Sequence, residues 1–309
     1  MILMRNFLPE GSLIGTRENK ERISSCNALV QAALDGEILE ATAFLCDSSR
    51  NLHVNLGCMT GVIPKNECAA VFDGEIKESA IISRVDRPVM FRILEIEDSG
   101  AGKFAVLSRR RVQEQCINDY VNALAPGDVI SAKVTHLDDY GAFCDIGAGV
   151  SALMPIDCIC VSRIPHPSAV LRCGQFIKAA VKSRDRQGRL TLTMKELLGT
   201  WEENAAFFRI GDTVPGIVRS IEKYGIFVEL SPNLAGLSEY VPGVNPGERT
   251  AVFIKSVNPA KMKVKLIITE DGGDLPPMSG LRYFFNGSHM DSFEYSPPSC
   301  PRRITTVFA

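Results

Sequence analysis

Two short segments combine the residue types that hold nucleic-acid bases. Tyr140-Gly141-Ala142-Phe143 and Tyr224-Gly225-Ile226-Phe227 stand 84 residues apart and are nearly the same. In each copy a later strand-like run carries cations, Arg189 in the first and Lys263 with Lys265 in the second. Aromatic rings beside cations on an exposed β surface can stack on unpaired bases and contact phosphates. The repeat also indicates that one small β module has been used more than once.

Strand alternation predicts where these side chains point, because successive residues of a strand face opposite ways. The neighbours of Phe143 are small or apolar and should face inward, so Phe143 and Asp145 should face outward. The same alternation places Arg189 outward, on the face of Phe143, with Tyr140 at the preceding turn. Phe227 has the same phase in its copy. A second interpretation stays open, in which the rings cover the end of a barrel core or pack on a linker helix.

The elements that must position these residues form three similar units of five short strands each. Five strands with a helical turn between the third and the fourth is the order of the small Greek-key barrel called the OB-fold. We therefore expect a mainly β protein with three tandem five-stranded OB-fold barrels, joined by short helices and followed by a C-terminal β-hairpin. The predicted boundaries are an N-terminal arm and helix at 1–35, a first barrel at 36–110, a helical linker at 111–126, a second barrel at 127–195, a helical linker at 196–210, a third barrel at 211–270 and the hairpin extension at 271–309.

The sequence makes more specific predictions for the two ends of the chain. Residues 1–17 look like a loose arm, and a helical apolar stripe follows over residues 17–34. Near the C-terminus, Asn286-Gly287 separates two aromatic, strand-like runs, which is a strong hairpin signal. An isolated hairpin is marginal in water, so we expect this one to dock on the third barrel, its aromatics serving for packing.

Composition limits the classes of function. The chain has 309 residues, 45% hydrophobic and 23% charged, and a formal net charge of -2. These values are those of an ordinary globular protein. Contacts with nucleic acid must therefore come from local cations and stacking. No apolar run approaches the roughly 20 residues of a membrane span, and the apolar start of the chain is too short for a signal peptide, so we expect a cytoplasmic protein without a membrane partner.

Nothing in the sequence indicates catalysis, a cofactor or a metal. The ten cysteines form no paired framework, which favours a reducing compartment. Cys158 and Cys160 have Cys-x-Cys spacing and His166 lies nearby, but a zinc knuckle needs Cys-x-x-Cys and a fourth ligand. Asp138-Asp139 fits a solvated turn better than a metal site, and no phosphate-binding glycine loop or catalytic triad is present. We expect a protein that is not an enzyme.

Over its whole length, the second unit resembles the S-one RNA-binding domain family. The residues that carry the resemblance are Gly127-Asp128-Val129-Ile130, Lys133-Val134, Asp138 to Phe143, Asp145-Ile146-Gly147, Cys173-Gly174-Gln175 and Asp185 to Leu190. The resemblance implies an OB-fold that binds RNA, and the tandem arrangement is similar to that of short bacterial members of the ribosomal S-one family.

What the family implies can be carried over only where residues match. Its RNA surface uses two aromatics, a His after the third strand, and an Asp and an Arg around the last turn. Tyr140 and Phe143 match the aromatics, and Asp185 and Arg189 match the last pair, while the His is missing because the chain has Leu153-Met154-Pro155 there. Lys133 is a further candidate contact.

The other two units depart from this pattern by different amounts. The third unit keeps Tyr224 and Phe227 and has Lys263 and Lys265 in place of the Arg, so we expect nonspecific phosphate contact there. In the first unit, alignment of the sequences puts Arg50 in the place of Tyr140, His53 in that of Phe143 and Lys103 in that of Arg189. The stacking aromatics are gone, and by analogy alone this unit binds protein, such as the ribosome, or is a purely structural barrel.

The leading hypothesis is a cytoplasmic protein that binds single-stranded RNA in translation. Its affinity should fall with salt, and its sequence preference should be modest. The alternative is a protein-binding adaptor, or an accessory of RNA decay, whose barrels are spacers.

Overall fold

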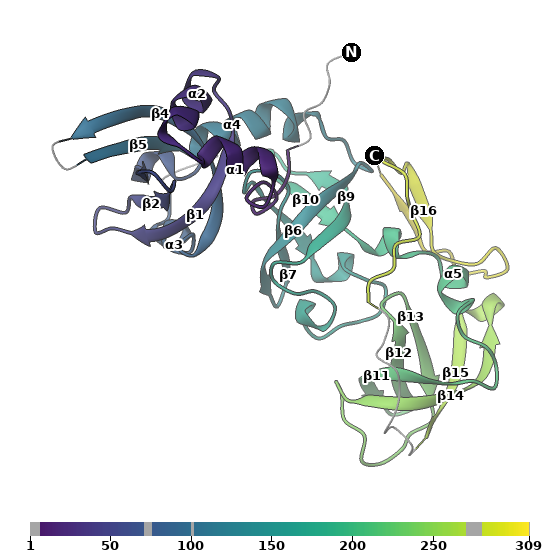
Figure 1. Ribbon diagram of the computed structural model, residues 1–309. Helices are drawn as coiled ribbons and strands as arrows, with labels where there is room; N and C mark the ends of the chain where they lie inside the picture. Colours follow the sequence, from purple (N-terminus) through teal and green to yellow (C-terminus); the bar gives the residue numbers. More distant parts are fainter. Residues whose placement is uncertain (1–6, 71–75, 100–101, 270–279, 309) are drawn as a thin grey trace. The chain divides into compact units, whose positions relative to one another are not determined.

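Three small β barrels make up most of the molecule in the computed structural model, which describes residues 7–70, 76–99, 102–269 and 280–308. They can be followed along the chain by colour in Figure 1. Each barrel is closed by five strands in the same order, with the first strand beside the second and the fourth, and the third strand parallel to the fifth. The predicted architecture of three tandem five-stranded barrels is confirmed.

Each barrel takes its five strands from one continuous stretch of the chain. The first barrel consists of β1 (Leu39–Cys46), β2 (Leu52–Asn55), β3 (Thr60–Ile63), β4 (Arg87–Ser99) and β5 (Gly102–Ser108). The second consists of β6 (Val129–Asp138), β7 (Gly141–Asp145), β8 (Ser151–Pro155), β9 (Phe176–Arg184) and β10 (Leu190–Thr193). The third consists of β11 (Thr213–Glu222), β12 (Gly225–Ser231), β13 (Leu234–Ser238), β14 (Arg249–Asn258) and β15 (Lys263–Thr269).

Short helices precede the barrels and interrupt them. The first barrel has η1 (Lys65–Glu67) and α3 (Glu78–Ile82) between its third and fourth strands, and the second has η3 (Ile156–Cys158) and η4 (Pro167–Ala169) there. The linkers contain α4 (Arg110–Asp119), η2 (Val121–Ala123), η5 (Lys195–Leu198) and α5 (Trp201–Ala205), and η6 (Pro259–Lys261) lies in the third barrel. The predicted helix over 17–34 is two helices, α1 (Arg17–Ile23) and α2 (Cys26–Leu34), because the hydroxyl of Ser25 accepts the Ala28 N–H and starts a new helix.

The chain forms two compact units. One contains residues up to 124 with 131–133 and 145–151, and the other contains 125–130, 134–144 and everything from 152 onward. The compact unit that contains the first barrel has a core of buried Leu, Ile and Val side chains together with Phe91. In the other unit, Trp201 of α5 and Tyr295 of the C-terminal segment complete the core of the third barrel. No helix in the described part of the chain is long and apolar enough to cross a membrane.

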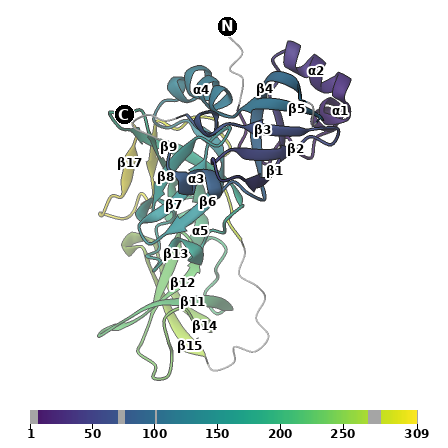
Figure 2. The ribbon, with the colours of Figure 1, turned by 90° about the vertical axis from the view of Figure 1, so that its left-hand side faces the viewer.

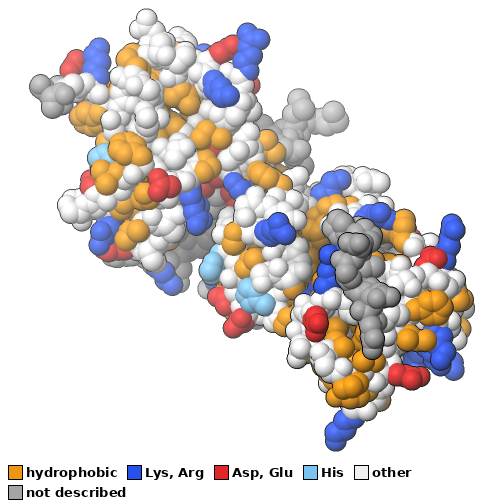
Figure 3. Space-filling view, turned by 60° about the horizontal axis from the view of Figure 1, so that its bottom comes forward, with side chains coloured by type: hydrophobic (Ala, Val, Ile, Leu, Met, Phe, Trp, Pro, Cys, Tyr) orange, Lys and Arg blue, Asp and Glu red, His pale blue; other side chains and the backbone are white. Residues whose placement is uncertain are grey.

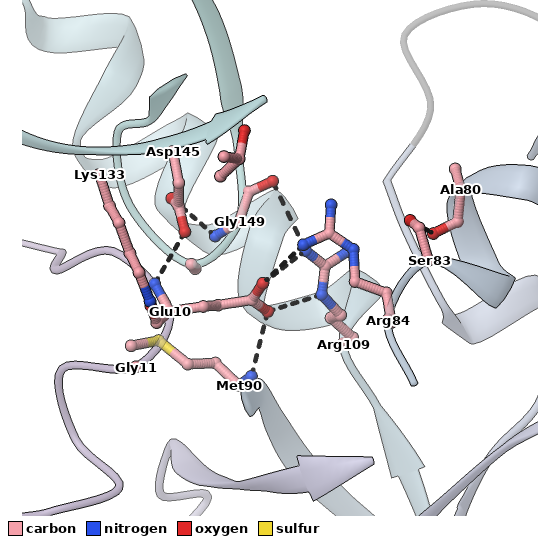
Figure 4. A network of polar contacts seen from close by, with 12 residues as sticks. Glu10, Gly11, Ala80, Ser83, Arg84, Met90, Arg109, Lys133, Asp145 and Gly149 are labelled. Carbon is pink, nitrogen blue, oxygen red and sulfur yellow. Dashed lines mark hydrogen bonds and ion pairs between the residues drawn. The ribbon is translucent and has the colours of Figure 1, made fainter. Parts of the chain in front are cut away.

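The N-terminal arm is not loose over its described residues. Glu10 is 4% exposed, and its carboxylate receives two hydrogen bonds from Arg109, from Nε at 2.6 Å and from Nη2 at 2.9 Å. Figure 4 shows these bonds together with the one that the Met90 N–H donates to the same carboxylate. A Cβ at Gly149, where φ is +77°, would lie 1.8 Å from Arg109 Nη2, so only glycine leaves room for the guanidinium. The arm is therefore fastened from residue 7 onward, and residues 1–6 lie outside the described part.

The C-terminal segment forms a two-stranded sheet, but the predicted turn is wrong. β16 (Ser292–Glu294) pairs with β17 (Thr305–Val307), so Asn286-Gly287 is not the turn that joins them. Gly287 also lacks the positive φ that a two-residue hairpin turn of this kind needs.

The C-terminal segment docks on two barrels. The Tyr295 hydroxyl donates to the Asn233 carbonyl of the third barrel, as the prediction required. Met290 and Phe308 pack with Ala180 of the second barrel and Leu197 of η5. Figures 1 and 2 both show the segment beside the second barrel.

Candidate nucleic-acid interface

The turn between β6 and β7 presents two aromatic rings on the second barrel. Tyr140 is 53% exposed, and Phe143 is half-buried between buried neighbours, as alternation predicted. The rings meet edge to face, with centroids 5.9 Å apart and an interplanar angle of 89°. The turn is tight because a Cβ at Gly141 would lie 2.3 Å from the Met154 carbonyl oxygen, which excludes any other residue. Both rings keep solvent-exposed surface, so neither is sealed in the barrel core.

The third barrel builds the same pair again. Tyr224 is 68% exposed and meets the half-buried Phe227 edge to face, at 6.1 Å and 89°. A Cβ at Gly225 would lie 2.3 Å from the Ser238 carbonyl oxygen, so this turn has the same constraint. Two barrels thus hold a Tyr and a Phe in one geometry, with an exposed ring edge and face available to a base.

Cations share the face of the aromatic pair on the third barrel. Leu237 on β13 lies opposite Phe227 on one side and opposite Lys265 on the other. Two strand spacings, about 10 Å, separate the aromatic from the cation. Lys263 and Lys265 are exposed and alternate with buried residues of β15, and neither ammonium has a partner among the described residues. Both charges remain available to phosphates.

Asp185 and Arg189 form a small unit at the β9–β10 turn of the second barrel. Asp185 accepts the backbone N–H groups of Gln187 and Arg189, and its other oxygen accepts a bond of 2.7 Å from Arg189 Nε. The side-chain bond from Arg189 lowers the pKa of Asp185. Asp185 therefore shapes the turn and orients the guanidinium, whose remaining N–H groups are exposed to solvent.

His136 is a candidate contact that sequence reasoning missed. It is exposed on β6 and stacks on Phe143, with ring centroids 6.1 Å apart and an interplanar angle of 28°. Simple alternation places residue 136 inward with Val134. In the third barrel the ladder is irregular between Val218 and Ser220, the residues that correspond in sequence to Val134 and His136, so a bulge there turns the later position outward. The second barrel thus has an imidazole beside Phe143, although the family's His after the third strand is missing.

Two residues lie elsewhere than expected. Lys133 is half-buried, and its ammonium donates to the Glu10 carbonyl at 2.8 Å, so it holds the N-terminal arm. The prediction that Asp145 faces outward is wrong, because it is 3% exposed and accepts the N–H groups of Glu10, Gly147 and Gly149. Burial raises the pKa of Asp145 to about 6. β7 ends at Asp145, so strand alternation no longer fixes the direction of this side chain. The three N–H donors hold its carboxylate inward instead.

Strand register changes the alignment of the first barrel. Val62 lies opposite His53 on one side and Val106 on the other, which is the arrangement of Phe227, Leu237 and Lys265 in the third barrel. Val106 therefore stands in the place of Lys265, and Phe104 in that of Lys263. The match of Lys103 with Arg189 is wrong, because Lys103 is one residue out of register.

The first barrel consequently has an apolar version of the face. His53 packs against Phe44 with centroids 6.3 Å apart, and Phe44 is 48% exposed. Arg50 is tied to Glu78 by an ion pair of 2.8 Å, which leaves it a poor counterpart of Tyr140. An aromatic and an imidazole remain, but the cations of the other two barrels are replaced by Phe104 and Val106.

The residues considered for a metal site have other partners. Cys158 Sγ lies 3.1 Å from Lys182 Nζ, Cys160 Sγ donates to the Ser162 carbonyl, and His166 Nδ1 is paired with Ser168. Within the described ranges, no three His, Cys, Asp or Glu side chains gather where they could hold a metal ion. On the face drawn in Figure 3 the Lys and Arg side chains are dispersed among acidic and uncharged ones.

Among known protein families, the S1 RNA binding domain matches residues 123–195 of this chain. The chain is 30% identical over 282 residues to the small ribosomal subunit protein bS1 of Staphylococcus aureus (strain COL), covering 84% of this chain and 68% of that protein. It is 32% identical over 197 residues to the small ribosomal subunit protein bS1 of Rhizobium meliloti (strain 1021), covering 58% of this chain and spanning only about a third, 34%, of that protein. A solved multidomain protein with nucleic acid binding domains from Streptococcus pneumoniae covers 78% of this chain and 75% of its own, with a TM-score of 0.25 and 13% identity.

Proposed function

We propose that this chain, which belongs to the bS1 family of small ribosomal subunit proteins, binds single-stranded RNA in translation through its second and third barrels. One observation carries the proposal: two barrels hold an exposed Tyr against a half-buried Phe in the same edge-to-face geometry. Repetition at one place of the fold is what a surface selected for one class of ligand requires. In this proposal the protein acts in the cytoplasm, by binding and not by catalysis.

The mechanism is stacking combined with phosphate contact. Tyr140, Phe143 and His136 offer ring faces to bases on the second barrel, and Arg189 offers N–H donors to a phosphate beside them. Stacking of a base on an aromatic side chain contributes about 1–3 kcal/mol. Each barrel alone holds a few nucleotides weakly, and the tandem arrangement raises the affinity through effective concentration. Sequence preference is modest, since every base has a face to stack.

The first barrel contributes differently. An apolar face with Phe104 and Val106 in the places of lysines does not attract phosphates, so this barrel contacts a protein, and the ribosome is the partner that the bS1 relatives suggest. Loss of RNA affinity on changing this face would contradict that division.

The test compares two aromatic substitutions. A double variant Tyr140→Ala, Phe143→Ala should bind labelled single-stranded RNA about tenfold or more weakly than the wild type. Phe44→Ala removes a ring of similar exposure from the first barrel and should change the affinity little. Fluorescence anisotropy at about 50 and 200 mM salt measures both affinity and its salt dependence. Equal binding by the double variant and the wild type would favour an adaptor whose barrels are spacers.

A further inference from the structure

A groove of about 550 Å³ lies in the unit that contains the third barrel, outside the aromatic faces. Three segments line it: the loop after β8, the start of η5 and the C-terminal sheet. Its lining includes Ile156, Arg163, Ile164, Lys195, Phe293 and Tyr295. The volume falls within the roughly 300–1,000 Å³ typical of ligand sites. We call it the C-terminal groove.

The loop that lines this groove is anchored to the turn that carries Tyr140. The Ile156 N–H donates to the Tyr140 carbonyl at 3.0 Å. At the far end of the same loop, His166 Nε2 lies 3.9 Å from an oxygen of Asp139. Since Ile156 bonds to the backbone of the Tyr140 turn and also lines the groove, the groove lies next to the turn that carries Tyr140.

The middle of the same loop reaches the third barrel. The Ser162 N–H donates to the Pro232 carbonyl at 3.1 Å, and the Val161 N–H donates to Asn233 Oδ1 at 3.0 Å. Both acceptors lie at the β12–β13 turn. The groove is therefore placed on the route between the second and third barrels, within one compact unit.

The chemistry of the lining suits a nucleotide. Ile164 and Tyr295 are buried and make an apolar surface beside the half-buried ring of Phe293. Arg163 is exposed, and its guanidinium has no partner among the described residues. Lys195 donates to the Asp157 backbone carbonyl, so no carboxylate neutralises its charge at contact distance.

The lining also holds two carboxylates, Asp157 and Glu196, and neither is in contact with the charged group of Arg163 or Lys195. The carboxylate of Glu196 is buried and accepts bonds from the hydroxyls of Thr193 and Thr306. Asp157 is the exposed one of the two. A free guanidinium can pair with a phosphate or stack on a base, whereas an apolar peptide would leave it without a partner.

We propose that the C-terminal groove is an additional RNA subsite, which holds the nucleotides that run from the Tyr140 face toward the third barrel. Arg163 contacts a phosphate, Lys195 supports it, and a base lies against Phe293. The inference rests on the proposed function. The subsite extends the proposed function because the C-terminal sheet, residues 292–307, lies outside the matched domain and would become part of the RNA path.

The experiment measures binding as a function of RNA length with the full chain. Oligouridylates of increasing length are titrated against the wild type, Arg163→Ala and Arg302→Ala. Arg302 is an exposed arginine of the C-terminal segment that does not line the groove, so its variant has the same change of charge. We expect Arg163→Ala to bind the shortest RNAs as the wild type does, to gain less affinity with length, and to lower the salt slope by about 0.7, the value for one phosphate contact with a single strand.

A second measurement locates the RNA directly. Oligouridylates that contain 4-thiouridine are crosslinked, and peptides from residues 156–164 and 292–306 should carry the label. The subsite would be overturned if the RNA affinity of the two arginine variants depended on RNA length and on salt in the same way. It would also be overturned if neither peptide carried a crosslink while the Tyr140 peptide did. Unchanged binding of every RNA length by Tyr140→Ala, Phe143→Ala would instead show that the proposed function itself has failed.

Discussion

Replacing Glu10 by Gln should destabilise the unit that contains the first barrel far more than the same change at an exposed ion pair. Glu10 and Arg109 are 4% and 3% exposed, and two hydrogen bonds join them. Burial alone would raise the pKa of Glu10, but the charge and the hydrogen bonds of Arg109 outweigh it, and the net pKa is lowered. The substitution leaves the buried guanidinium without the carboxylate that contacts it.

The magnitude follows from that uncompensated charge. Removing one partner of a buried ion pair typically costs about 3–5 kcal/mol. At about 3 °C per kcal/mol for a unit of this size, the midpoint of thermal unfolding should fall by roughly 10–15 °C. Far-UV circular dichroism measures the midpoint. Faster hydrogen exchange in peptides that span residues 7–14 and 105–112 would place the change at the network of Figure 4.

The matched control is Glu78→Gln. Glu78 pairs with Arg50 at 2.8 Å, but about half of its side chain is exposed, so water replaces the lost interaction. We expect its midpoint to stay close to that of the wild type. If Glu10→Gln lowered the midpoint no more than Glu78→Gln, the N-terminal arm would not be held by this ion pair, and the reasoning would be refuted.

Two further predictions test charge elsewhere. The raised pKa of Asp145, about 6, means that the folded chain keeps a proton that the unfolded chain loses near pH 4. On account of this group, the free energy of unfolding should fall by up to about 3 kcal/mol as pH rises from 4 to 6. Asp145→Asn should remove that part of the pH dependence of the urea midpoint. An unchanged profile would mean that the N–H donors keep the carboxylate ionised. Replacing Lys263 and Lys265 together by Gln should lower the salt slope of RNA binding by about 1.4, two phosphate contacts with a single strand, and an unaltered slope would remove these lysines from the interface.

The sequence predicts the scaffold well because strand alternation and the repeat are local signals. Phe143 and Phe227 lie outward between buried neighbours, and each barrel has the five strands predicted for it. The structure adds the reason for the glycine of the Tyr-Gly-x-Phe segment, because a Cβ at Gly141 would collide with the Met154 carbonyl oxygen. The aromatic part of the candidate site follows from these signals alone.

Long-range contacts decided what the sequence did not predict. His136 is exposed although alternation places it inward, and the corresponding position of the third barrel lies at an irregularity of the strand ladder. Asp145 faces inward because backbone N–H groups from three separate residues reach it, including that of Glu10, 135 residues away. The Asn286-Gly287 signal was overridden by the burial of Tyr295 and Phe308, which fixes the two strands of the C-terminal sheet farther along the chain.

The first barrel shows why register matters more than alignment for function. Sequence matching kept a cation at Lys103, whereas the parallel pairing of β3 with β5 puts Phe104 and Val106 at the two positions where the third barrel has lysines. A shift of one residue moves a side chain to the other face of a strand. The same five-stranded scaffold thus presents two exposed lysines or two apolar side chains at the same two positions of its last strand. Tandem copies of one barrel can therefore differ in the chemistry of this face without any change of fold.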